Sequence, residues 1–252
     1  MIIDAYTHCA LDKFRPIEDV RSMMAVGGIR GAVLAQHLGQ YDNSYIAACV
    51  QSDPQSLTGV AMIDIAAPDA EDRLEDVIGA QVFRGLRMTA AMLRQAPGIA
   101  SAAIEAGLHL VLYCPDGTDE IASVLPALAS GPGRIVITHL GSPIVSDGRL
   151  ARGEEILRLV PDPRIMVTLS GAGMACDPPH EPLGPLVRKI VDGFGAERVM
   201  WASNYPVVGD QDAARADLDL LLTNYWGLPA SAIEPISGVV AERTWFIGGR
   251  NE

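Results

Sequence analysis

The sequence predicts an α/β fold of the (β/α)8 TIM-like barrel type, formed by residues 1–252 as a single domain. Three observations predict it: eight short apolar runs, segments of helical periodicity between them, and a length of 252 residues, close to that of a typical closed barrel. The runs are apolar almost throughout, which is typical of strands buried on both faces of a parallel sheet.

The eight predicted strands start about 25 to 35 residues apart, the spacing expected for a repeated strand and helix unit. They lie at residues 2–8, 29–36, 57–65, 83–89, 108–114, 134–141, 164–171 and 198–206. A doubly wound open sheet is the alternative. However, the turn after the first strand lacks a GxGxxG pattern, and the number of strands matches that of a closed barrel.

The intervening segments predict helices, of which residues 68–80 give the clearest pattern. Asp69 is a suitable N-cap, Leu74 and Val77 fall on one face, and Gly79 stands near the end. Similar helices are predicted at 15–28, 117–131 and 182–195.

Charge and composition narrow the classes of partner. Apolar residues make up 49% of the chain, and 31 acidic residues outnumber 19 basic ones. The resulting field repels nucleic acid and anionic membrane surfaces, so we expect neither as a partner. A small anionic substrate remains possible where arginines gather locally. The aromatic segment 223–228 predicts helix packing or a contact in a homo-oligomer.

The cysteines and the start of the chain predict a cytoplasmic location. The four cysteines form no CxxC pair, which is typical of reduced thiols rather than of a disulfide or zinc framework. The first predicted strand begins at Ile2 without a signal-like segment before it, and no apolar stretch reaches transmembrane length.

Polar residues at the ends of predicted strands are the candidates for catalysis, because barrel enzymes use the carboxyl ends of their strands. Tyr6 and His8 are two residues apart and therefore share a face of the first strand. His139 ends the sixth strand, Asn204 the eighth, and Arg87 the fourth. Each alone also has a structural explanation, such as barrel packing for Tyr6 or a loop cap for Asn204.

Together, the motifs resemble the amidohydrolase superfamily, in its amidohydrolase-related branch of lactonases, decarboxylases and hydratases. They are "IIDAYTH", "VFRGLR", "THLGSP", "VTLSG" and "MWASNYP", and they span nearly the whole chain. The resemblance implies a barrel in which paired histidines, a sixth-strand histidine and a last-strand aspartate surround the reacting carbon, usually with a divalent metal.

Two departures from the family pattern change the expected chemistry. Tyr6 replaces the first histidine of the pair, and Asn204 replaces the aspartate. A phenol is a poor metal ligand until it ionises, and a carboxamide cannot take a proton. Since only His8 and His139 remain as clear ligands, short of the three that catalytic zinc needs, we expect no bound metal and no other cofactor.

Metal-free lactonases of the family imply the roles that remain. In them histidines polarise the lactone carbonyl and arginines hold carboxylates. Tyr6, His8 and His139 are therefore expected to polarise a carbonyl, with Asn204 orienting water or donating a hydrogen bond. The base that replaces the aspartate is left open between His8, His139 and the loop carboxylates Asp116, Asp177 and Glu181.

Substrate binding is assigned first to Arg87, because a guanidinium is the natural partner of a carboxylate. Arg94, His37 and Tyr113 are further candidates near the same strand ends. The predicted function is metal-independent hydrolysis of a small carboxylate-bearing lactone or cyclic ester. The alternatives are an isomerase or lyase that moves a proton next to a carbonyl or decarboxylates its substrate, and a barrel that binds a ligand without catalysis.

Overall fold

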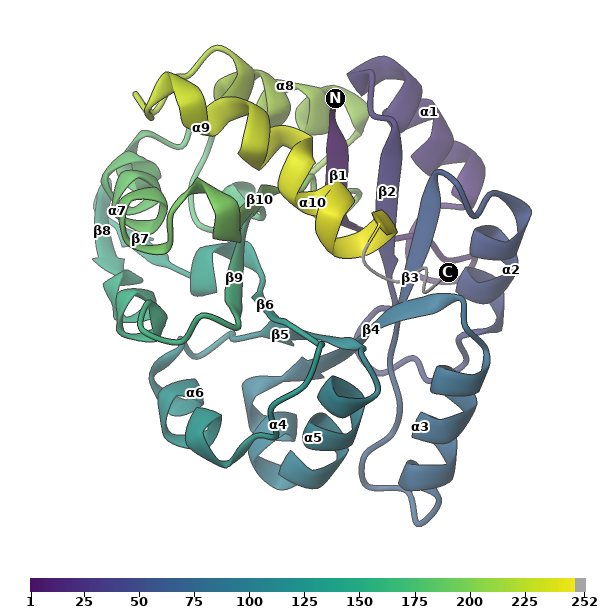
Figure 1. Cartoon of the computed structure of the whole chain (residues 1–252). Coiled ribbons are helices and arrows are strands. Elements are labelled where there is room, and N and C mark those ends of the chain that lie inside the picture. The colour runs from purple at the N-terminus through teal and green to yellow at the C-terminus, as the bar shows by residue number, and fades with distance from the viewer. Residues whose placement is uncertain (248–252) are drawn as a thin grey trace.

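Eight parallel strands form a nearly closed barrel in the computed structural model, which describes residues 1–247 (Figure 1). The strands are β1 Ile3–Thr7, β2 Gly31–Ala35, β3 Leu57–Ala61, β4 Phe83–Thr89, β5 His109–Tyr113, β6 Ile135–Ile137, β9 Ile165–Leu169 and β10 Val199–Trp201. They neighbour one another in that order. The predicted barrel and its eight strands are confirmed.

Helices surround the barrel on its outer side (Figure 1). They are α1 Ile17–Gly27, α2 Ser44–Ser52, α3 Ala70–Gly79, α4 Ala90–Gln95, α5 Pro97–Glu105, α6 Asp119–Val124, α7 Gly184–Phe194, α8 Gln211–Leu222 and α9 Ala230–Glu234. The short helix α10 Val240–Glu242 instead lies across one end of the barrel and packs in its interior cluster. The four predicted helices correspond to α1, α3, α6 and α7. In α3, Leu74 and Val77 are buried, as the apolar pattern predicts.

The C-terminal segment closes the amino end of the barrel. After α10, a π-helical turn at Arg243–Ile247 carries Trp245 into the interior, where it joins the barrel-filling cluster with residues such as Val111 and Met200. Gly85 makes room for it, because a Cβ there would lie 3.3 Å from the indole ring and 2.9 Å from the carbonyl of His109. The polar cavity must therefore lie at the carboxyl end.

Hydrogen bonds between the ends of β1 and β10 complete the ring of strands. Asn204 N–H donates to Tyr6 O at 3.0 Å, and His8 N–H donates to Tyr205 O at 2.8 Å. The buried carboxylate of Asp4 accepts from the backbone and hydroxyl of Ser203. Burial raises the pKa of Asp4 to about 6, although these hydrogen bonds lower it. Asp4 thus acts as a structural hydrogen-bond partner.

Two local features differ from simple strand geometry. The register of β1 shifts between Asp4 and Thr7, so Ala5 packs in the interior cluster beside Tyr6 instead of on the opposite face. An antiparallel hairpin, β7 Ile144–Ser146 and β8 Arg149–Arg152, follows β6 and was not predicted. Its short strands lack the long apolar runs on which the prediction of barrel strands depended.

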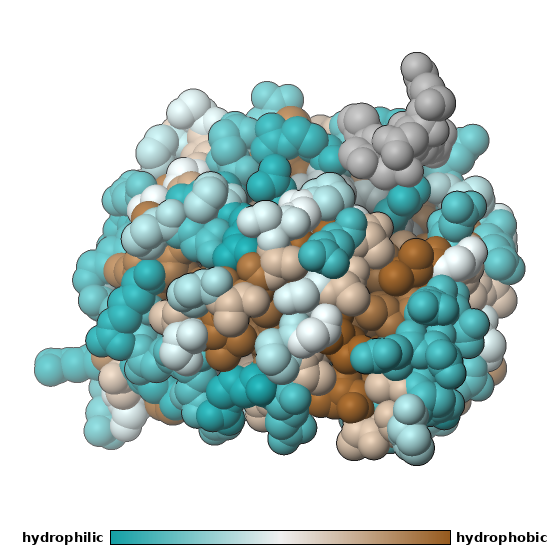
Figure 2. All heavy atoms as spheres, turned by 60° about the horizontal axis from the view of Figure 1, so that its bottom comes forward, coloured by the Kyte–Doolittle hydropathy of each residue, from teal (hydrophilic) through white to brown (hydrophobic). Residues whose placement is uncertain are grey.

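The outer surface mixes both kinds of residue. Figure 2 shows one side of the molecule, on which hydrophilic residues surround a central group of hydrophobic ones. Among residues 1–247, no helix is both long enough and apolar enough to cross a membrane. That the protein forms a homo-oligomer, as the aromatic segment 223–228 suggested, stays a prediction.

Candidate active site

A cavity of about 130 Å³ opens at the carboxyl end of the barrel. Six residues predicted from the sequence line it: His8, His37, Arg87, Tyr113, His139 and Asn204. A larger hollow of about 460 Å³ lies at the amino end, but there both ring nitrogens of His109 are already hydrogen-bonded. Chemistry rather than size therefore identifies the candidate site.

His8 follows β1 and is almost fully buried. Its Nδ1 lies 2.6 Å from the carbonyl oxygen of Ala35, and its ring stacks on Phe14 with 4.8 Å between centroids. Burial and the nearby Arg87 guanidinium hold the pKa of His8 well below its usual value. The imidazole is therefore neutral near pH 7.

His139 lies just beyond β6, in a left-handed turn with φ 56°. This backbone conformation is uncommon for residues other than glycine and is often found at functional sites. The ring Nδ1 lies 2.9 Å from Ser170 Oγ, which in turn lies 2.8 Å from Thr168 Oγ1. Burial, followed by the charge of Arg87, lowers the pKa of His139 to about 3. This second imidazole is neutral as well.

Tyr6 lies between the two histidines without itself lining the cavity. Its ring meets His8 and His139 edge-on, with centroid distances of 4.9 and 5.2 Å. The hydroxyl is buried and has no hydrogen-bond partner in residues 1–247. Burial raises the pKa of Tyr6 to about 12 although the Arg87 charge opposes the shift, so the phenol keeps its proton.

Arg87 brings a buried positive charge to the site. The residue is only 5% exposed, and its Nη1 donates to the carbonyl of Gln36 at 2.5 Å. Its Nε has no partner, and no carboxylate of residues 1–247 forms an ion pair with it. An unpaired buried guanidinium is costly, so this arrangement suits a negatively charged ligand.

Asn204 occupies a left-handed turn after β10, with φ 53°. Its amide donates to Met174 Sδ at 3.4 Å, while its buried Oδ1 has no partner in the described chain. No Asp or Glu of residues 1–247 lines the cavity. The three loop carboxylates considered as replacement bases, Asp116, Asp177 and Glu181, are all exposed and lie outside it.

The structure does not bring Arg94 into the cavity. Its guanidinium is about half exposed and pairs with Glu120 at 3.1 Å on the surface. Conversely, sequence reasoning missed Lys13, which lies in the loop after β1 and lines the cavity beside Phe14. Its place in the loop that directly follows His8 is the signal from which it could have been found.

The residues present do not fit a catalytic metal. Within residues 1–247, no three or more His, Cys, Asp and Glu side chains converge as a ligand set. Three histidines line the cavity, His8, His37 and His139, but they do not converge on one point, while Tyr6 holds its proton and Asn204 is uncharged. A catalytic zinc normally has three protein ligands.

Comparison with known proteins places the chain among enzymes of similar fold. The family model described as "Amidohydrolase" matches residues 4–247. L-fucono-1,5-lactonase of Burkholderia ambifaria is 26% identical over 201 residues, covering 75% of this chain and 69% of that protein.

Two solved structures superpose over almost the whole chain. A Pseudomonas putida protein described as a 2-pyrone-4,6-dicarboxylic acid hydrolase has a TM-score of 0.74 and 22% identity, covering 100% of this chain and 98% of the other. The 2,6-dihydroxybenzoate decarboxylase from Rhizobium has a TM-score of 0.68 and 13% identity, with 98% and 99% covered. At these identities the two structures show a shared fold.

Proposed function

Because the chain belongs to the amidohydrolase family and is an enzyme of that hydrolase-related group, we propose that it hydrolyses a small lactone bearing a carboxylate, without a bound metal. The observation that carries this proposal is the buried guanidinium of Arg87, which has an unpaired Nε and no carboxylate partner in residues 1–247. A substrate carboxylate supplies the missing charge, in the bidentate geometry that guanidinium favours.

The similarity to an L-fucono-1,5-lactonase supports a lactone as the reacting group. The cavity lining argues against a sugar lactone, because it contains no carboxylate to bind several hydroxyls and includes Phe14, Leu38, Met174 and Val207. Such a wall favours an apolar ring or chain beside the carboxylate. The volume of about 130 Å³ favours a compact substrate.

The proposed reaction begins with attack of water on the lactone carbonyl carbon. A neutral imidazole takes one proton from the water, while donors at the site stabilise the oxyanion that forms. The carbon to ring-oxygen bond then breaks, and the ring oxygen receives the proton from the imidazolium. The product is a hydroxy acid, and Tyr6, with its unpaired hydroxyl, serves as an additional donor.

Hydrolysis of a panel of small lactones in the presence of a chelator tests this proposal. Each carboxylate-bearing lactone is paired with the uncharged lactone of the same ring. We expect turnover of the acids, at least about 100-fold slower turnover of the uncharged partners, and no effect of the chelator, because two charge-assisted hydrogen bonds are lost without the carboxylate. Activity that disappears on chelation, or no turnover of any acid, would contradict it.

A second candidate is proton transfer next to a carbonyl, without water as a reactant. The lack of a carboxylate at the cavity favours it, since Asn204, which cannot take a proton, stands where the family resemblance expects the water-activating aspartate. The reaction in ¹⁸O water and in D₂O separates the two candidates. Hydrolysis places ¹⁸O in the product carboxylate, whereas isomerisation places deuterium on carbon and no ¹⁸O.

A further inference from the structure

The two histidines of the site differ in the partner of their Nδ1 atom. A neutral imidazole carries one hydrogen, so a ring whose Nδ1 donates has an Nε2 that accepts, and the reverse also holds. Neither Nε2 has a hydrogen-bond partner within residues 1–247, and neither is among the fully buried unpaired atoms. Both rings line the cavity, so the tautomer decides what each Nε2 offers a substrate.

His8 must carry its hydrogen on Nδ1. The Nδ1 atom lies 2.6 Å from the carbonyl oxygen of Ala35, and a carbonyl only accepts hydrogen bonds. Its Nε2 therefore presents a lone pair. Stacking on Phe14 and edge contact with Tyr6 hold the ring in this orientation.

The tautomer of His139 follows from counting hydrogens in a buried chain of hydroxyls. Thr168 Oγ1 accepts from His139 N–H, and the only acceptor within its reach in residues 1–247 is Ser170 Oγ, at 2.8 Å. If Thr168 donates to Ser170, then Ser170 donates to His139 Nδ1 at 2.9 Å. Every hydroxyl hydrogen then has an acceptor, and His139 carries its own hydrogen on Nε2.

The opposite arrangement leaves a buried hydrogen unpaired. If His139 Nδ1 donated to Ser170, the hydroxyls of Thr168 and Ser170 could donate only to each other, and one of the two hydrogens would have no acceptor in residues 1–247. Both residues are buried, so the unpaired hydroxyl costs about 1–3 kcal/mol. Gly171 leaves room for the ring in this position, because a Cβ there would lie 2.8 Å from His139 Nδ1.

We propose that the two histidines divide the work of hydrolysis, with His8 Nε2 as the base that activates water and His139 Nε2–H as the donor to the carbonyl oxygen. Ser170, which is hydrogen-bonded to Thr168, is the positioning residue that fixes the tautomer of His139. This division rests on the proposed lactone hydrolysis. His8 then serves as the base, a role that Asn204 cannot fill. A neutral imidazole such as that of His139 is known to polarise carbonyl groups in other enzymes.

The proton balance is complete with these groups. Water gives a proton to His8 Nε2 as its oxygen bonds to the acyl carbon, and the carbonyl electron pair moves to the oxygen that His139 Nε2–H binds. When the tetrahedral intermediate collapses, that pair reforms the double bond. The ring oxygen leaves with the proton from His8.

Nitrogen-15 NMR of the intact enzyme, with His8→Gln and His139→Gln for signal assignment, reads both tautomers without any substrate. We expect hydrogen on Nδ1 of His8 and on Nε2 of His139 at pH 7. Ser170→Thr, which keeps the hydroxyl, should preserve the His139 pattern and kcat. Ser170→Ala removes the hydrogen-bond partner of His139 Nδ1, so it should give a tautomer mixture and lower kcat by about 3- to 10-fold with KM unchanged.

Glutamine variants test the two roles, because glutamine donates a hydrogen bond but cannot accept a proton. His8→Gln should lose about 100- to 10,000-fold in kcat, like His8→Ala. His139→Ala should lose about 100- to 1000-fold, but His139→Gln no more than about tenfold, because a donor remains. The reversed order of the two glutamine variants would overturn the assignment.

Failure of the inference and failure of the proposed function are distinguishable. Hydrogen on His8 Nε2 or on His139 Nδ1 overturns the inference whatever the enzyme hydrolyses. Identical spectra and kcat for Ser170→Ala and Ser170→Thr would show that Ser170 does not fix the tautomer of His139. Absence of lactone turnover with the expected tautomers would overturn the proposed substrate and leave the donor and acceptor pair intact.

Discussion

The two ends of the barrel use the same residue types in opposite ways. At the amino end, His109 donates from Nε2 to Thr244 O at 2.9 Å and accepts from Arg134 N–H at its Nδ1. At the carboxyl end, His8 and His139 each have one bonded nitrogen and one open to the cavity. A histidine with both nitrogens satisfied stabilises the fold, whereas one with a free nitrogen is available for chemistry.

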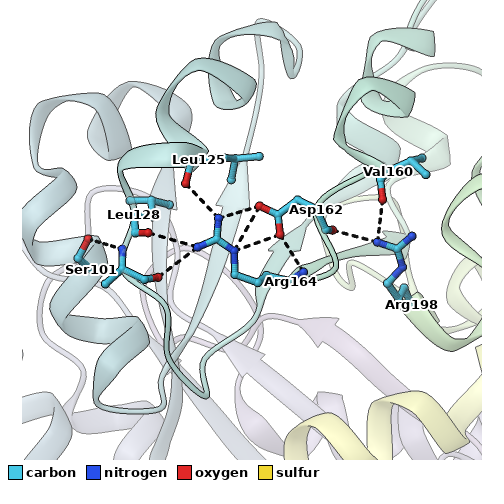
Figure 3. A network of polar contacts seen from close by, with 8 residues as sticks. Ser101, Leu125, Leu128, Val160, Asp162, Arg164 and Arg198 are labelled. Atoms are coloured by element: carbon cyan, nitrogen blue, oxygen red, sulfur yellow. Dashed lines mark hydrogen bonds and ion pairs between the residues drawn. The ribbon is translucent and has the colours of Figure 1, made fainter.

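The arginines repeat this contrast. Before β9, Arg164 pairs with Asp162 and also donates to the carbonyls of Leu125, Leu128 and Ala129, as Figure 3 shows. In the same network Arg198 donates to the carbonyls of Val160 and Asp162. Arg87 is more deeply buried than Arg164 and has no such counter-ion within residues 1–247. The buried charge of Arg87 lowers stability at the carboxyl end of the barrel, and this is the end at which we expect a ligand to bind.

Arg87→Met should break the contrast with the largest effect. It removes the proposed carboxylate partner, and we expect kcat/KM for an anionic lactone to fall about 100- to 1000-fold. Because the lost charge was buried and unpaired, the free energy of unfolding should stay the same or rise. Steady-state kinetics and urea unfolding measure the two quantities. Unchanged kinetics would refute the role of Arg87 in binding.

Arg164→Met is the matched change at the amino end. It removes an ion pair and hydrogen bonds to the carbonyls of Leu125, Leu128 and Ala129, so the free energy of unfolding should fall by about 2–4 kcal/mol. The kcat/KM of the folded enzyme should not change. A loss of activity without a loss of stability would show that the two ends are not independent.

Lowering the pH should destabilise the carboxyl end of the barrel, because His139 has a lowered pKa there. The pKa of His139 is lowered to about 3 in the fold, so the native state binds fewer protons than the unfolded chain below pH 6.5. The stability that this ring contributes is present above pH 6.5. It is lost as the pH falls toward the pKa of about 3 that His139 has in the folded protein. Between pH 7 and pH 5 the loss is about 2 kcal/mol for one such imidazole.

The His139→Gln variant isolates this contribution. Asp4, whose pKa is raised to about 6, acts in the opposite direction, but it does so in both proteins. Urea unfolding at pH 7 and pH 5 should therefore show a smaller loss in the variant by about 2 kcal/mol. Equal losses in both proteins would mean that His139 is already protonated or exposed in the fold.

Lys13→Met should have the smallest effect. Lys13 is exposed at the cavity mouth, where solvent and salt screen its charge. We expect KM for an anionic lactone to rise about 2- to 5-fold at low salt, with kcat unchanged and the difference shrinking as salt is added. An effect as large as that of Arg87→Met would place the substrate carboxylate at the mouth instead.

The sequence by itself determined the barrel and the end of it that carries the candidate site. Apolar runs and helical periods are local properties, and residues at strand ends must gather at one rim once the sheet closes. For that reason His8, His139, Asn204 and Arg87 could be named in advance. Arg94 was placed there by the same rule, but a surface carboxylate, Glu120, draws it away.

Only the tertiary structure decided which atoms of those residues are free. The partner of His8 lies 27 positions along the chain, at the end of β2, and that of His139 lies 31 positions along, directly after β9. Whether a ring nitrogen donates, or whether a guanidinium meets a carboxylate, depends on such distant contacts. Residue type fixes how many hydrogens a side chain has, and packing fixes where they point.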